Sequence, residues 1–115
     1  MKLEEARAFA LSLPETSEAP HHRMSSFRVR GKIFATVPVD GEHLHVFVDE
    51  LETHAAAAEN PRAFAELWWG KRLAGVRVNL RAADSELVLD LLEEAWRRKA
   101  PASLAAESYS RESGT

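Results

Sequence analysis

The sequence of 115 residues contains no cysteine. This absence excludes disulfide bonds, thiolate metal ligands and a cysteine nucleophile, and it suits a protein of the reducing cytoplasm. Long hydrophobic runs are also missing, since none approaches the roughly 20 apolar residues of a membrane-spanning helix. Residues 1–6 carry acids where a signal peptide would have its apolar stretch. We therefore expect a cytoplasmic protein that does not associate with membranes.

Motifs for catalysis and for phosphate binding are missing as well. Gly70-Lys71 lacks the upstream glycine and the following Ser or Thr of a P-loop, and no Gly-X-Ser-X-Gly occurs. The chain has five histidines, but nothing in their spacing brings together the three or four donors that a zinc-like ion needs. The sequence therefore predicts a protein without enzymatic activity, without a bound metal and without a cofactor.

The composition is that of one globular domain, with 45% hydrophobic and 29% charged residues. The net charge of −3 argues mildly against nucleic acid as a partner, but the charge is unevenly distributed. Residues 67–81 hold four cations and no acid, and residues 21–48 hold four cations against two acids. The predicted strands are therefore basic and the predicted helices acidic, which allows two faces of opposite sign.

Residues 26–48 form the centre of the predicted fold. Three short runs rich in Phe and β-branched residues are separated by Gly31-Lys32 and by Asp40-Gly41. Asp-Gly tolerates the positive φ angles of a tight hairpin turn, so this stretch predicts three antiparallel strands. The run 33–37 is apolar on both faces, which is typical of a central strand. A further strand is predicted at 75–81, where apolar residues alternate with Arg and Asn.

Helices are predicted on both sides of these strands. Residues 3–13 carry an apolar stripe, and Asp49 caps a helix that Asn60-Pro61 interrupts. A second piece then follows to Gly70, with Phe64, Leu67 and Trp68 as its buried stripe. Asp84 or Ser85 begins the last helix, which ends at Lys99. Residues 14–25 are predicted to be a loop, because they contain two prolines and little periodicity.

This order of elements predicts one α/β (α+β) domain over residues 1–106, followed by a mobile tail at 107–115. The domain would hold a four-stranded antiparallel sheet with helices packed on one face. Polar side chains that alternate with the buried ones would lie on the opposite, open face. These candidate residues for binding nucleic acid or another anion are Arg28, Arg30, His43, His45, Arg77, Asn79 and Arg81.

Three stretches together resemble the MmcQ/YjbR family of small bacterial proteins. They are residues 4–18 (Glu-Glu-Ala-Arg-Ala-Phe-Ala-Leu-Ser-Leu-Pro-Glu-Thr-Ser-Glu), 27–35 (Phe-Arg-Val-Arg-Gly-Lys-Ile-Phe-Ala) and 91–101 (Leu-Leu-Glu-Glu-Ala-Trp-Arg-Arg-Lys-Ala-Pro). The resemblance covers residues 1–106. It implies a fold like that of CyaY, the bacterial frataxin, with a twisted antiparallel sheet and helices on one side. It also implies a relation to proteins commonly labelled DNA-binding.

Three functions remain open at this point. The favoured one is weak electrostatic binding of DNA by the basic open face. The alternative is a pocket for a small anionic metabolite, in which Trp69 would offer a ring for stacking. The candidate residues of that pocket are His21, His22, Trp69, Lys71 and Arg72. The third possible function is that of a protein-interaction domain that uses an uncovered sheet edge. We expect the protein to be a monomer. A helix-turn-helix at 50–68 is excluded, because its second helix offers only Arg62 as a cation.

Overall fold

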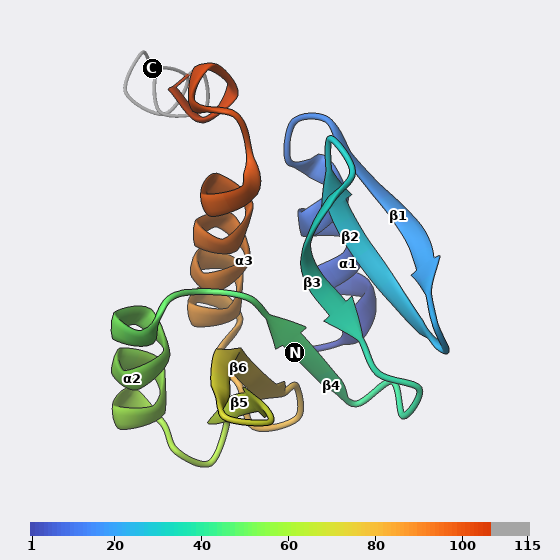
Figure 1. The fold of residues 1–115 in the computed structure, drawn as a ribbon. Helices are drawn as coiled ribbons and strands as arrows, with labels where there is room; N and C mark the ends of the chain where they lie inside the picture. The colour runs from blue at the N-terminus through green and yellow to red at the C-terminus, as the bar shows by residue number, and fades with distance from the viewer. Residues whose placement is uncertain (107–115) are drawn as a thin grey trace.

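The computed structural model describes residues 1–106, and the predicted mobile tail, 107–115, lies outside the described residues. Figure 1 shows how the helices and strands follow one another along the chain. Their bounds are α1 (Leu3–Ser12), β1 (Thr16–His21), β2 (Met24–Val29), β3 (Lys32–Val37), β4 (His43–Val46), α2 (Glu50–Glu59), β5 (Phe64–Trp69), β6 (Arg72–Asn79) and α3 (Ser85–Lys99). Residues 102–106 are also helical.

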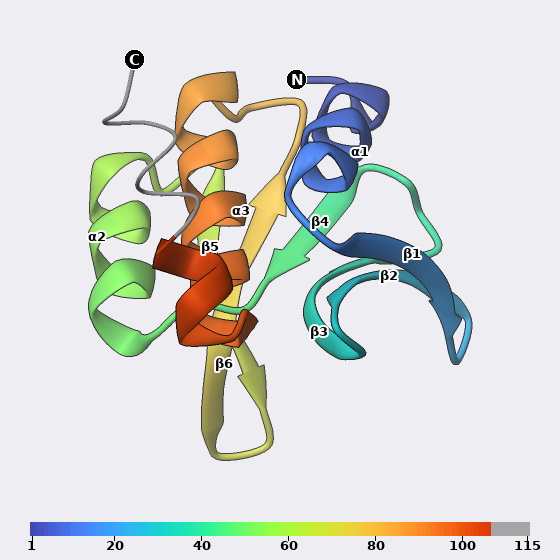
Figure 2. The ribbon, with the colours of Figure 1, turned by 90° about the horizontal axis from the view of Figure 1, so that it is seen from above.

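The strands of the described part of the chain form one six-stranded sheet in the order β1-β2-β3-β4-β6-β5. Every neighbouring pair is antiparallel. The three labelled helices lie on one side of this sheet (Figure 2). The predicted antiparallel sheet with helices on one face is therefore confirmed, but it has six strands rather than the predicted four.

The prediction of a loop at residues 14–25 is wrong. This stretch contains the edge strand β1, which pairs with β2 from Thr16↔Val29 to His21↔Met24. Pro20 lies in the strand although it has no N–H to donate. An edge strand tolerates this, because only one side of its backbone takes part in the ladder. Pairing with β2 thus outweighs the low strand propensity of a short, polar, proline-containing segment.

The prediction of a helix after Asn60-Pro61 is also wrong, because residues 64–69 form β5. The register of β5 against β6 shifts between Leu67 and Trp68. Both buried residues of β5, Phe64 and Leu67, precede this shift and lie on opposite faces of the sheet. Phe64 belongs to the main core, and Leu67 belongs to a second apolar cluster with Phe47 and Ala74. Because they are three apart, they resemble the stripe of a helix in the sequence. Trp68, predicted to lie in the core, is 51% exposed.

The helix boundaries follow the predicted capping residues. The Asp49 side chain accepts a hydrogen bond from the Glu52 backbone N–H at 2.9 Å, at the start of α2. The Asp84 side chain accepts one from the Glu86 backbone N–H at 3.1 Å, at the start of α3. Within residues 1–106, no helix is long and apolar enough to cross a membrane.

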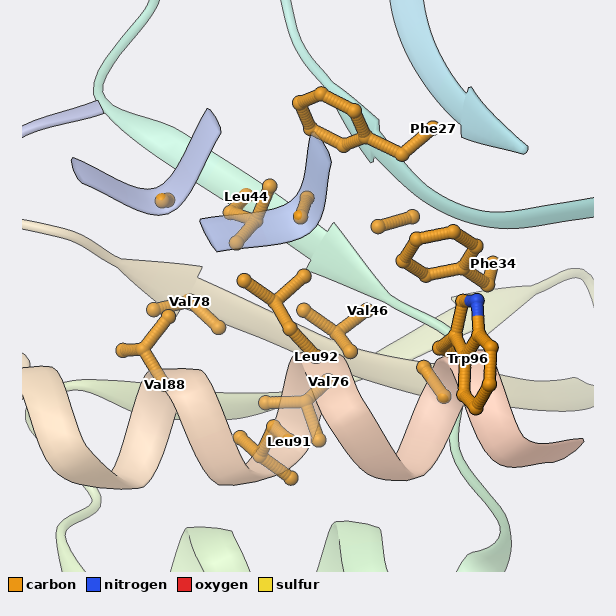
Figure 3. Close-up of a cluster of buried hydrophobic side chains, with 14 of the residues drawn as sticks. Phe27, Phe34, Leu44, Val46, Val76, Val78, Val88, Leu91, Leu92 and Trp96 are labelled. Carbon is orange, nitrogen blue, oxygen red and sulfur yellow. The ribbon is translucent and has the colours of Figure 1, made fainter. Parts of the chain in front are cut away.

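The main core lies between the sheet and the helices. The strand residues predicted to face the helices, among them Val29, Val46 and Val78, are fully buried. Figure 3 shows Val46 and Val78 facing the side chains of α3, among them Val88 and Leu92. Trp96 of α3 is also fully buried, and its indole N–H donates a hydrogen bond to the Pro14 carbonyl oxygen at 3.0 Å. The predicted alternation of β2, β4 and β6 is therefore confirmed on this face of the sheet.

Candidate functional site

The sheet divides into two diverging halves where β4 ends. β4 is short: its pairing with β6 ends at Val46, and its last hydrogen bond to β3 runs from the Phe47 backbone N–H to the Phe34 carbonyl oxygen at 3.1 Å. The chain then leaves the sheet toward α2, so β4 no longer bridges the first residues of β3 and β6 (Figure 2). A cavity of about 460 Å³ lies at this division. Cavities of roughly 300–1,000 Å³ are typical of small-molecule sites.

We call this cavity the His45 pocket. One wall comes from the end of the β1–β2 hairpin and the other from the β5–β6 hairpin. The N-terminal end of α2 and the C-terminal end of α3 complete its rim. Its lining residues are His21, Met24, Ile33, Thr36, His45, Phe47, Val48, Asp49, Glu50, Trp69, Arg72, Leu73, Ala74, Arg98 and Lys99.

Two polar side chains in the pocket lack hydrogen-bond partners. Thr36 and His45 lie directly opposite each other on β3 and β4. Thr36 is only 2% exposed, and within residues 1–106 neither its Oγ1 nor the Nε2 of His45 has a partner. A buried polar atom without a partner costs roughly 1–3 kcal/mol, and such atoms are few in native proteins. A ligand or an ordered water in the pocket would supply the missing hydrogen bonds.

His45 is held in its neutral form. Burial lowers the pKa of its imidazole, and the positive charge of Arg77 and the neighbouring His43 lower it further, while Asp40 opposes them. Thr36 is uncharged, so this end of the pocket offers hydrogen-bonding groups rather than charge. A neutral imidazole offers one donor and one acceptor nitrogen.

Lowering the pH from 7.5 to 5.5 is expected to reduce the free energy of unfolding through His45. Its ordinary pKa is 6.5, and the folded value is lower. At a pH above 6.5, His45 is neutral in both the folded and the unfolded chain, and its contribution to stability is fully present. As the pH falls below 6.5 and through the folded pKa, the unfolded chain binds a proton at His45 before the folded chain does, so this contribution is lost. Urea denaturation at both pH values measures the change, and His45→Gln should make it smaller. An unchanged pH dependence in His45→Gln would contradict this assignment.

A second apolar cluster lies beside the pocket, on the side of the sheet away from the helices. It contains Phe47, Leu67 and Ala74, with Ile33 packed against them. The ring of Phe47 also contacts Trp69 edge to face, with the ring centroids 5.0 Å apart. This contact fixes an indole that is still 51% exposed. The pocket thus presents an oriented aromatic surface to solvent.

The cations at the rim differ in how they are engaged. Arg98 donates from Nη1 to the Phe47 carbonyl oxygen at 2.8 Å. Arg72 and Lys99, by contrast, form no ion pair within residues 1–106. They are therefore available to a ligand with negative charge.

Two carboxylates also line the rim, and both have partners. Asp49 caps α2, and Glu50 Oε1 lies 3.4 Å from the Nε2 of His54. The rim thus combines three cations, Arg72, Arg98 and Lys99, with two acids, so that it has one excess positive charge. This balance favours a ligand with a single negative charge over one with several.

The sequence placed five residues in a predicted pocket, and the structure brings three of them together. His21, Trp69 and Arg72 line the His45 pocket, whereas His22 and Lys71 lie in the turns of the two hairpins, outside the lining. Trp69 and Arg72 lie directly opposite each other on β5 and β6. His45, which was predicted as part of the basic face, lines the same pocket.

Four residues of the predicted basic face meet across β4 and β6. His43 lies opposite Asn79, and His45 lies opposite Arg77. The Nη2 of Arg77 is 3.9 Å from Asp40 Oδ2. The same carboxylate contacts the Nδ1 of His43 at 2.9 Å. Asp40 therefore offsets positive charge at the centre of this face.

The other arginines of the predicted face are spread over the molecule. Arg30 lies in the turn between β2 and β3 and forms an ion pair with Glu15 at 2.9 Å. Arg81 follows β6 and forms one with Glu42 at 3.2 Å. Arg28 is a strand residue, and its guanidinium donates to a neighbouring hydroxyl and to a backbone carbonyl. These arginines do not gather into one patch of unpaired charge.

Sequence reasoning missed Thr36, Phe47 and the end of α3 as parts of the site. A signal was present in the run 33–37, which is apolar on both faces and so indicates that both faces are covered. Phe47 shares a strand face with His43 and His45. A large apolar residue on that face also indicates that part of the face is covered. For Arg98 and Lys99, no sequence pattern placed the end of α3 beside Phe47 at the end of β4. Within residues 1–106, no three His, Asp or Glu side chains converge to hold a metal ion.

Comparison with known proteins supplies a family and a fold. A model of the YjbR family matches residues 11–98, which confirms the resemblance found in the sequence. The fold is similar to the crystal structure of the Deinococcus radiodurans protein DR2400, described as a DUF419 domain. The TM-score is 0.72 and the identity 20%, with 84% of this chain and 77% of that chain covered. At this identity the similarity supports the fold alone. No curated protein matches the chain.

Proposed function

The chain belongs to the YjbR family, and we propose that it is a non-enzymatic module that binds a small anionic ligand in the His45 pocket. The observation that carries this proposal is the pair of unsatisfied atoms, Thr36 Oγ1 and His45 Nε2, in a cavity of about 460 Å³. A folded protein tolerates such atoms where a ligand or ordered water completes their hydrogen bonds.

The charge of the ligand follows from the rim. Arg72 and Lys99 line the pocket without an ion pair in the described part of the chain. A carboxylate or phosphate group bound there would form charge-assisted hydrogen bonds, which are about twice as strong as neutral ones. The low-polarity cluster around Phe47 would contact the rest of the ligand.

Electrostatic binding of DNA is the competing proposal. It would need several cations to neutralise phosphates together. Arg30, Arg77 and Arg81 instead have carboxylate partners at 2.9, 3.9 and 3.2 Å. Exposed ion pairs of this kind contribute only about 0–1 kcal/mol each to stability, so the phosphates of DNA could replace the carboxylates. Their separation over different turns and strands nevertheless favours the pocket as the functional site.

A thermal-shift screen tests the proposal with inorganic phosphate, acetate, citrate and benzoate as probes. Each is compared with chloride at equal ionic strength. A probe at 100 times its Kd should stabilise the folded state by about 2.7 kcal/mol, which raises Tm by several degrees. Arg72→Gln should at least halve this rise. Lys71→Gln, the matched control one residue away in the turn, should leave it unchanged.

Two results would count against the proposal. One is the absence of any shift beyond that of chloride. The other is an equal loss in both variants, which would indicate a general charge effect.

Fluorescence anisotropy with random duplex DNA at several salt concentrations tests the competing proposal of DNA binding. DNA binding requires log affinity to fall linearly with log salt, and replacing Arg28 and Arg77 together by Gln should flatten that slope.

A further inference from the structure

The β5–β6 hairpin places an indole ring beside a guanidinium group. Trp69 and Arg72 are directly opposite in register, so their Cβ atoms lie about 4.5–5.5 Å apart on the same face of the hairpin. Trp69 is held edge to face by Phe47 at 5.0 Å but remains 51% exposed. A flat ring stacked on Trp69 would therefore bring a substituent directly to Arg72.

The pocket is neutral at its other side. Thr36 and His45 are also directly opposite in register, on β3 and β4. Their unpartnered Oγ1 and Nε2 can each take part in a hydrogen bond with an uncharged group. The pocket thus presents three different surfaces: a neutral hydrogen-bonding pair, an aromatic plane and a cationic edge.

On the basis of the proposed function, we infer that the ligand is a planar aromatic acid with a single negative charge and a polar substituent on its ring. The ring stacks on Trp69, the acid group binds Arg72, and the substituent forms hydrogen bonds with Thr36 and His45. A carboxylate suits the guanidinium, because its two oxygens match two parallel N–H donors.

The rim also disfavours acids with more than one charge. Asp49 and Glu50 line the same pocket as the three cations Arg72, Arg98 and Lys99. A second negative charge on the ligand would meet these carboxylates with too few cations to offset them. A monocarboxylate leaves the local charge close to balance.

Matched probes separate the contributions of ring, charge and substituent. Isothermal titration calorimetry is carried out with 4-hydroxybenzoate, benzoate, cyclohexanecarboxylate and phenol. Benzoate and cyclohexanecarboxylate carry the same charge at similar size, but only benzoate is flat. We expect benzoate to bind about two- to tenfold more tightly than cyclohexanecarboxylate, and 4-hydroxybenzoate to bind more tightly than benzoate by a similar factor. Phenol should bind more weakly than either aromatic acid.

Two variants test whether the ring of the ligand stacks on Trp69. Trp69→Ala should abolish the preference for benzoate over cyclohexanecarboxylate. Trp68→Ala is the matched control, because Trp68 is its neighbour on β5, is equally exposed at 51%, and does not line the pocket. It should leave the preference unchanged.

Two kinds of failure remain distinguishable. Equal affinity for the flat and the non-planar acid, or a preference that survives Trp69→Ala, would overturn the aromatic inference while leaving anion binding in the pocket intact. If no acid binds in the calorimeter and none raises Tm in the wider screen, the proposed function fails together with the inference.

Discussion

Replacing Gly75 with alanine is expected to lower the free energy of unfolding by about 3 kcal/mol, as in severe overpacking of a core. A Cβ atom at this position would lie 2.1 Å from the carbonyl oxygen of Val46 and 2.9 Å from the Cα of Phe47. Both are backbone atoms of the neighbouring chain segment, so no side-chain rotation can relieve the contact. β6 would have to move away from the end of β4, where the His45 pocket begins.

Urea denaturation measures this loss, and another glycine provides the control. Gly41 lies in a turn with φ +67°, and a Cβ atom added there would meet no other atom within 4 Å. Gly41→Asn should cost less than about 1 kcal/mol, because asparagine tolerates this backbone conformation. If Gly75→Ala lowered the free energy of unfolding by less than about 1 kcal/mol, β6 and the end of β4 would be able to move apart with little loss of stability, which would contradict this prediction.

Replacing Trp96 with alanine is expected to destabilise the protein by about 3–5 kcal/mol. Its side chain is fully buried among residues of the main core (Figure 3). The substitution leaves a large cavity between α3 and the sheet. It also removes the hydrogen bond from the indole to the Pro14 carbonyl oxygen, which joins α3 to the start of the chain. A domain of this size has a total stability of roughly 6–17 kcal/mol, so the loss is severe.

Two variants make the Trp96 measurement specific. Trp96→Phe keeps most of the buried apolar surface and loses only the hydrogen bond and part of the ring, so its cost should be clearly smaller. Trp68→Ala makes the same chemical change at an exposed tryptophan and should cost less than about 1 kcal/mol. Denaturation curves in urea compare all three. A similar cost at Trp68 and Trp96 would contradict the packing described for α3.

The sequence by itself determined the elements whose patterns are local. Apolar stripes and capping residues indicated all three labelled helices, and Asp49 and Asp84 cap α2 and α3 as predicted. Alternation in β2, β4 and β6 indicated which side chains face the helices. These features depend on residues within one or two turns or strands of each other, and such neighbours are visible in the sequence.

The edge strands could not be recognised in this way. β1 is polar and contains Pro20, and its strand conformation depends on pairing with β2. β5 buries Phe64 in the main core and Leu67 in the second apolar cluster on the other face, and two buried residues three apart resemble a helical stripe. In both cases tertiary hydrogen bonds decide the conformation against the local pattern, because a strand's stability comes from its neighbours.

The pocket, like the fold, could be predicted from the sequence only in part. Sequence reasoning selected Trp69, Arg72 and His21 as one candidate group and His45 as a member of another. Only the fold brings them together, because β4 ends early and the halves of the sheet diverge beyond Val46. Where a strand ends relative to partners far along the chain is set by packing of the whole sheet. The residue types of the site were therefore present in the sequence, but their convergence was decided by the tertiary structure.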